Sequence, residues 1–164
     1  MTDAPPILLR EACADDAAAL ANIYCTAVMA IPVNVYALVQ KTAWSIGKHD
    51  PSFWQQRLAQ PNRHTVVAVY RQIVVGFIEY QADQDYIDCL YVSPHHQRQG
   101  VASALLKHVM ALPRDKRLNV FTVQAAHPAV PFFRQHGFQW VRENHILCGN
   151  VILTNHTMRL TQPL

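Results

Sequence analysis

The chain has 164 residues, of which 51% are apolar and 15% are charged. This length suits one domain, and the apolar fraction supports a sizeable core, so the composition excludes a disordered protein. The net charge of +3 comes from Lys and Arg residues that are scattered rather than gathered in a basic stripe, so we expect no nucleic-acid partner.

Cysteine usage and the N-terminus predict a cytoplasmic protein. The four cysteines form no C-x-x-C pair and no Cys/His ladder, which favours free thiols in a reducing compartment. No basic, apolar signal peptide opens the chain, and no apolar run approaches the ~20 residues that span a bilayer. The nine histidines show no spacing typical of metal ligands. We therefore expect no membrane association and no metal.

The first third of the chain predicts a strand and then three helices. Asp15 or Asp16 can cap the first helix, and Pro32 interrupts it. Asp50 followed by Pro51 is typical of a capped helix start. The expected elements are a strand at Ile7–Arg10, a helix from Asp16 toward Pro32, a helix over Asn34–Ile46, and a helix from Pro51 to Pro61.

The rest of the chain alternates strands with two helices. Val- and Ile-rich runs separated by Arg71-Gln72 predict a hairpin, and a second hairpin is expected around Gly149-Asn150. The expected strands are His64–Tyr70, Ile73–Tyr80, Tyr86–Val92, Leu118–Val123, Phe138–Ile146 and Val151–Leu160, with helices at Gly100–Leu112 and Pro128–His136. The order predicts a single α/β (α+β) domain over 1–164, with a core from about 7 to 160 and a mostly antiparallel sheet of six to seven strands flanked by helices.

The segment Leu90–Ser103 is the most informative stretch. A strand ends, a polar loop follows, and a helix opens at Gly100. The first amides of a helix lack internal partners and carry the positive end of its dipole, so they bind anions. Gly100 lets a phosphate approach the backbone, and Gln97 and Arg98 add side-chain donors.

This turn resembles a known family. The run Gln97-Arg98-Gln99-Gly100-Val101-Ala102 matches the Q/R-x-x-G-x-G/A acetyl-CoA signature of the GNAT N-acetyltransferases, and Pro131–Phe138 resembles their helix–Gly-Phe–strand segment. The resemblance extends from about Ile7 to Leu160. It implies an acetyl-CoA-dependent acyltransferase with a primary amine of a small molecule or peptide as acceptor.

The family implies specific cofactor contacts. Its central strand splays from a neighbour, and the pantetheine arm lies in the gap. Carried over, the backbone of Leu90, Tyr91 and Val92 would bind the arm, the amides of Gln97–Ala102 would hold the pyrophosphate, and Ser103 would add a hydroxyl. Phe133 would lie beside the cofactor.

Two positions depart from the family. Many members have a tyrosine at Phe133, where it protonates the departing thiolate, and an asparagine at Ala126. The proton then comes from water or from another residue, with Tyr91, Tyr36 and His127 as candidates. The same departures leave open a catalytically weak acyl-CoA-binding module and an enzyme that uses another acyl-CoA.

Glu79 and Asp88 are the candidate general bases, because both lie on strands beside the expected gap. Strand alternation would place Asp88 on the face of Leu90 and Val92. The alternative is that both carboxylates are ordinary solvent-side groups. Tyr91 completes the candidate catalytic set.

The helices after the first strand are expected to shape the acceptor pocket, with Tyr36 and Trp44 as its candidate residues. The apolar side chains there either pack the helices on the sheet, line an apolar acceptor pocket or form a homodimer surface. They are Met29, Ile31, Val33, Val35, Tyr36, Val39, Trp44, Phe53 and Trp54.

Overall fold

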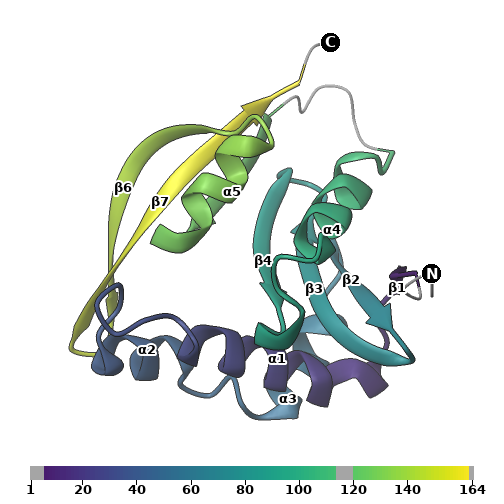
Figure 1. Ribbon diagram of the computed structural model, residues 1–164, viewed down its shortest axis with the longest axis horizontal. Coiled ribbons are helices and arrows are strands. Elements are labelled where there is room, and N and C mark those ends of the chain that lie inside the picture. The colour runs from purple at the N-terminus through teal and green to yellow at the C-terminus, as the bar shows by residue number, and fades with distance from the viewer. Residues whose placement is uncertain (1–5, 114–119, 163–164) are drawn as a thin grey trace, which may run out of the picture.

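A computed structural model describes residues 6–113 and 120–162. The chain forms one layered α/β unit, drawn in Figure 1. Its strands are β1 (Leu8–Glu11), β2 (Arg63–Tyr70), β3 (Ile73–Gln81), β4 (Tyr86–Val92), β5 (Val120–Ala125), β6 (Gln139–Cys148) and β7 (Val151–Thr161). Its helices are α1 (Ala17–Met29), α2 (Leu38–Ser45), α3 (Pro51–Leu58), α4 (Val101–Met110) and α5 (Val130–Gln135). No helix in the described ranges is long and apolar enough to cross a bilayer.

The seven strands form one sheet in the order β1-β2-β3-β4-β5-β7-β6. Every neighbouring pair is antiparallel except β4 and β5, which run parallel. Both expected hairpins, β2–β3 and β6–β7, are present. The predicted fold class, a mostly antiparallel sheet flanked by helices, is confirmed.

Each face of the sheet carries its own core. Helices α4 and α5 cover one face, where Leu105, Val109 and Phe133 pack on Ile78 and Ile87. Helices α1 and α3 cover the other face, with a separate cluster formed by Leu20, Ile23, Tyr24, Trp54, Val67 and Phe77. Figure 1 shows α4 beside β3 and β4, with α1 and α3 running along the bottom of the view. The middles of β2 and β3 are therefore buried on both sides, which accounts for their Val- and Ile-rich runs.

Some expected boundaries were wrong. The helix expected over Asn34–Ile46 begins at Leu38, since residues 33–36 form a turn that closes on the Pro32 carbonyl and Ala37 is extended. Asp16 does precede α1, but its carboxylate binds Arg10 and the Cys13 amide instead of helix amides. The expected strand start at Leu118 lies outside the described residues.

Strands β4 and β5 separate soon after they meet. They pair at Tyr86–Thr122 and Ile87–Val123 and not beyond. Among the described residues, the edge of β4 that faces β5 therefore has no strand partner from Asp88 to Val92, and the sheet opens there (Figure 1). The splay that the family resemblance implied is present.

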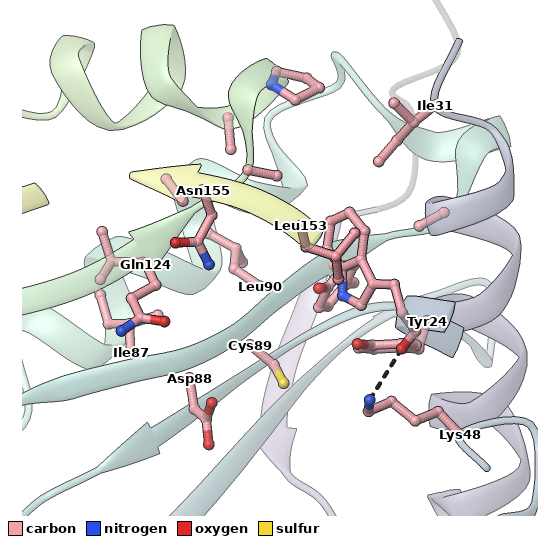
Figure 2. Close-up of a pocket in the computed structure, with 18 of the residues that line it drawn as sticks. Tyr24, Ile31, Lys48, Ile87, Asp88, Cys89, Leu90, Gln124, Leu153 and Asn155 are labelled. Carbon is pink, nitrogen blue, oxygen red and sulfur yellow. Dashed lines mark hydrogen bonds between the residues drawn. The ribbon is translucent and has the colours of Figure 1, made fainter. Parts of the chain in front are cut away.

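A β-bulge at Asp88 overturns one expectation. Tyr80 pairs with Ile87 and Glu79 pairs with Cys89, so Asp88 is the extra residue of β4. Figure 2 shows Asp88 and Cys89 projecting to the same side of the strand. Asp88 therefore shares the α3 side with Glu79, and the expectation that it shares a face with Leu90 and Val92 was wrong.

Candidate functional site

A cleft of about 500 Å³ occupies the opening between β4 and β5. Its walls come from α1, α3 and the segment between them, from β4 and β5, from the start of α5, and from β6 and β7. Figure 2 shows Leu90 of β4 on the same side as Gln124 of β5 and Asn155 of β7, whereas Asp88 projects from β4 to the other side. The cleft therefore joins both halves of the sheet at the point where their pairing ends.

The loop before α4 places a helix N-terminus beside this cleft. Gly100 caps α4 with a φ of 83° in the left-handed region, and a Cβ built on it would meet nothing within 4 Å. Gln97 lines the cleft and donates to the Val92 carbonyl at 3.1 Å, which ties the loop to the end of β4. The space beside Gly100 at the cap of α4 is thus open, and the first amides of a helix are the groups that bind anions.

Other predicted residues of this turn have identifiable places. Val101 is 3% exposed and packs into the α4 core, whereas Arg98 and Gln99 are exposed. Ala102 and Ser103 are half-buried in the first turn of α4. The Gln99 amide donates to the His95 carbonyl at 3.3 Å, so its side chain holds the loop rather than projecting freely.

Gly76 on β3 sets the height of α4 above the sheet. A Cβ at this position would lie 3.0 Å from Val101 Cγ1, 3.1 Å from the Tyr91 carbonyl and 3.3 Å from Val92 Cγ2. The absence of a side chain therefore lets the first residue of α4 rest on the strand pair. The motif search missed Gly76, because nothing in its local sequence marks the contact.

A cluster of two arginines and two carboxylates lies at the bulge. Arg57 of α3 and Arg63 of β2 each bind both Glu79 and Asp88. Arg57 Nη2 is 2.9 Å from Asp88 Oδ2, and Arg57 Nε is 3.1 Å from Glu79 Oε2. Glu79 is 1% exposed, so its charge depends on these partners.

The two candidate bases differ in their access to the cleft. Asp88 lines it and Glu79 does not. Burial alone would raise the pKa of Asp88, but hydrogen bonding to Arg63 and the charge of Arg57 lower it below its usual value. Oδ2 of Asp88 accepts from Arg57, Arg63 and Gln81, and the described residues supply no donor to Oδ1. An ionised carboxylate with one committed oxygen and one open oxygen therefore borders the cleft.

The same cluster contains three groups with metal-ligand chemistry. Ligand atoms of Glu79, Asp88 and Cys89 lie within 4.8 Å of one another. The guanidinium groups of Arg57 and Arg63 already bind both carboxylates. Burial also raises the pKa of the Cys89 thiol well above its usual value, which opposes the thiolate that a metal needs. Positive charge in this cluster therefore comes from arginine.

Tyr36 joins the segment before α2 to the far half of the sheet. It is 2% exposed, and its hydroxyl donates to the Thr154 carbonyl at 2.6 Å and accepts from the His127 amide at 3.1 Å. Its ring stacks on His127 at 5.0 Å, and the His127 ring lies 2.6 Å from His156 Nε2. Tyr36 lines the cleft, as predicted for the pocket, but its hydroxyl is committed to structure.

Phe133 and Ala126 both line the cleft, so the two departures from the family pattern lie in the site itself. Phe133 is 3% exposed and packs against Phe138 at a ring distance of 5.2 Å. Burial raises the pKa of Tyr91 well above its usual value, and burial also raises that of Tyr36. Both phenols hold their protons more tightly than a free tyrosine does.

Trp44 lines the cleft together with a lysine that the motif search missed. The Trp44 ring lies edge-on to Tyr36 at 5.5 Å, and its carbonyl accepts from Lys48 Nζ at 3.0 Å. Lys48, Arg57 and Arg63 come from segments with no signature of their own. The signal that could have found them is their charge in otherwise apolar surroundings, since buried cations need partners.

Several of the apolar residues expected to pack, to line a pocket or to form a dimer surface lie either in the cleft lining or on the exposed surface. Ile31, Tyr36, Trp44, Phe53 and Trp54 line the cleft. Val33 and Val39 are 70% and 63% exposed and Met29 is 44% exposed. The apolar-pocket interpretation thus fits five of them.

Comparisons with known proteins agree with this geometry. The family model described as an acetyltransferase (GNAT) domain matches residues 32–160. The uncharacterized N-acetyltransferase YafP of Escherichia coli (strain K12) is 37% identical over 140 residues, which cover 85% of this chain and 86% of that protein.

Two solved structures share the fold. A GCN5-related N-acetyltransferase from Rhodopseudomonas palustris is 25% identical, with a TM-score of 0.87 and 99% of each chain covered. The PaiA N-acetyltransferase of Thermoplasma acidophilum, in complex with coenzyme A, is 14% identical, with a TM-score of 0.79 and 96% of this chain and 99% of that one covered.

Proposed function

The chain belongs to the GNAT acetyltransferase family, and from that premise we propose that it transfers an acetyl group from acetyl-CoA to a primary amine of a small molecule or peptide. The amine attacks the thioester directly while both substrates are bound. The residues proposed for the cofactor are those of the turn Gln97–Ser103 and the strand edge Leu90–Val92, with Phe133 beside them.

One observation carries this proposal: the open N-terminus of α4 lies at the end of the strand whose edge faces the splay. The loop that carries Gly100 is tied to Val92 by Gln97, and the unpaired edge of β4 begins at Asp88. An elongated ligand with a phosphate group at one end can therefore bind helix amides and strand backbone together. The related fold from Thermoplasma is a complex with coenzyme A, a ligand of this shape.

Asp88 is the proposed contact for the acceptor amine. Its open Oδ1 would accept a hydrogen bond from the nitrogen and orient the lone pair toward the thioester carbon. A carbon–nitrogen bond forms, the carbon–sulfur bond breaks, and CoA leaves as the thiolate. Because Asp88 has a lowered pKa, it orients the amine rather than storing its proton, and that proton passes to solvent. The thiolate also takes its proton from water, since Phe133 has none to give and Tyr36 and Tyr91 hold theirs.

Thermal unfolding with acetyl-CoA tests the cofactor site, since a ligand that binds the native state raises Tm by mass action. We expect a Tm rise for the native chain and none for Gly100→Glu, which sets a carboxylate where the pyrophosphate would bind. Gly149→Glu is the matched control, because Gly149 also has a positive φ and open surroundings, but lies in the β6–β7 turn. A full Tm rise in Gly100→Glu would overturn the site.

A screen for CoA release with amine acceptors tests the reaction. Turnover with at least one primary amine supports acetyl transfer. A Tm rise without CoA release from any amine would instead support a catalytically weak acyl-CoA-binding module, which Phe133 and Ala126 in the cleft favour. Faster turnover of succinyl-CoA than of acetyl-CoA in direct competition would replace the acetyl donor in the proposal.

A further inference from the structure

The cleft contains two cationic side chains, and they differ in how their charges are balanced. Among the described residues Arg57 and Lys48 line it. Arg57 and Arg63 share two carboxylates, Glu79 and Asp88, so that cluster is neutral. Lys48 has no such partner, because no carboxylate of the described ranges pairs with its Nζ.

The ammonium of Lys48 has capacity left for a ligand. It carries three N–H donors. The Trp44 carbonyl accepts one at 3.0 Å, and the described part of the chain offers no acceptor to the other two. The side chain is half-buried in the cleft wall, so an anion that reached it there would be bound with less screening than at the surface.

Aromatic rings fix the position of this charge. Lys48 Nζ lies 5.6 Å from the centroid of Tyr24 and 5.9 Å from that of Phe53. The Lys48 carbonyl accepts from Trp54 Nε1 at 2.8 Å, which anchors the backbone. In Figure 2 the ammonium end of Lys48 lies under Tyr24 and is directed toward the strand that carries Cys89 and Asp88. The charge is therefore held over an apolar, aromatic wall.

We propose that Lys48 is the binding group for a carboxylate on the acceptor, so that the acceptor is an amine with an apolar body and a single anionic group. This inference rests on the proposed function, because it treats the cleft as the acceptor site. Asp88 would hold the amine end, Lys48 the anionic end, and Tyr24 and Phe53 the apolar part between them. One uncompensated positive charge matches one carboxylate.

Matched acceptors with and without a carboxylate test this inference. Two pairs are suitable: phenylalanine against phenethylamine, and 4-(aminomethyl)benzoate against benzylamine, which differ in the spacing between amine and carboxylate. We expect the native enzyme to favour the carboxylated member of at least one pair by about tenfold or more in kcat/KM, as a charge-assisted hydrogen bond provides. Lys48→Met should remove this preference mainly through KM, and Lys48→Arg should retain part of it.

The control separates specificity from structure. Lys107→Met removes a lysine from the exposed face of α4 and should leave the preference unchanged. If Lys48 only caps the end of α2 through the Trp44 carbonyl, Lys48→Met would slow both members of a pair equally, and the inference would be overturned. If the native enzyme turned over the carboxylated and uncarboxylated members equally in both pairs, the inference would be overturned as well.

Product binding keeps this test independent of turnover. Calorimetry of both product pairs, N-acetylphenylalanine against N-phenethylacetamide and 4-(acetamidomethyl)benzoate against N-benzylacetamide, measures the same preference without chemistry, with the CoA complex of the native chain and of Lys48→Met. Tighter binding of the carboxylated product that Lys48→Met abolishes supports the inference even when no amine is turned over. Equal binding of the two products in both pairs refutes it, while a Tm rise with acetyl-CoA would still support the cofactor site.

Discussion

The proposed cofactor turn uses one contiguous stretch of chain, whereas the charged cluster at the opposite wall of the cleft draws its members from four elements. Gln97–Ser103 leads directly into α4 and follows β4 after only the short turn at Pro94–His96. Arg57, Arg63, Glu79 and Asp88 come from α3, β2, β3 and β4. In the proposed function the turn binds through backbone amides, and the cluster acts through specific side chains that must meet in space.

This difference determines what holds each region together. The turn depends on backbone conformation and on the close approach of α4 to β3, so its sensitive positions are glycines. The wall depends on charge balance in a buried place, so its sensitive positions are ion-pair members. The predictions below test whether the two regions separate in this way, with the wall controlling stability and acceptor use and the turn controlling acetyl-CoA affinity.

The largest expected effect comes from Arg57→Met, which leaves Glu79 buried with one of its two arginines removed. We expect the free energy of unfolding to fall by about 3 kcal/mol, the order found when a buried pair loses one partner. Urea denaturation followed by circular dichroism measures it. The double variant Arg57→Met/Glu79→Gln should recover more than half of the loss, because both charges are then removed. A loss below about 1 kcal/mol in the single variant would show that Arg63 alone satisfies the cluster.

The next effect concerns the acceptor and distinguishes the two candidate bases. Asp88→Asn should lower kcat/KM for the acceptor about 30-fold, since about 2 kcal/mol of charge-assisted hydrogen bonding to the amine is lost. The KM for acetyl-CoA should stay unchanged. Glu79→Gln makes the same charge change in the same cluster but outside the cleft lining, so it should reduce stability more than turnover. The reverse pattern would assign the amine contact to Glu79.

Features set by the local sequence could be predicted, and features set by contacts between distant segments could not. The sheet, both hairpins and the α4 start were predictable, because alternating Val and Ile runs and the Gly100 turn are local signals. The bulge at Asp88 was not, since it depends on how β3 and β4 pair, and it placed Asp88 on the opposite face from the one expected. The structural role of the Tyr36 hydroxyl was not predictable either, because its acceptor, the Thr154 carbonyl, is 118 residues away. Contacts that are distant in sequence leave no local pattern.

A smaller effect is expected at Gly76, on the cofactor side. Gly76→Ala places a Cβ 3.0 Å from Val101 Cγ1, so the N-terminus of α4 must shift by a few tenths of an ångström. We expect acetyl-CoA affinity to fall about tenfold, roughly 1.4 kcal/mol, with the acceptor preference unchanged. Calorimetry with acetyl-CoA measures this. Val101→Ala in the same chain removes the Cγ1 contact and should restore part of the affinity, and an unchanged affinity in the single variant would show that Gly76 does not position α4.

The smallest expected effect is a pH profile in which Asp88 does not titrate between pH 5 and 7. Hydrogen bonding to Arg63 and the charge of Arg57 hold the pKa of Asp88 below its usual value, so the carboxylate is ionised throughout the range in which the enzyme is assayed. Its lowered folded-state pKa also means that its contribution to stability is complete above about pH 4 and is lost only as the pH falls further. With 4-(aminomethyl)benzoate as acceptor, kcat/KM should therefore rise with pH up to the alkylammonium pKa of about 10, with no inflection between pH 5 and 7. Such an inflection in the native enzyme that Asp88→Asn removes would mean that Asp88 has a raised pKa and stores the proton. The acceptor wall would then act as a general base and not as an orienting surface.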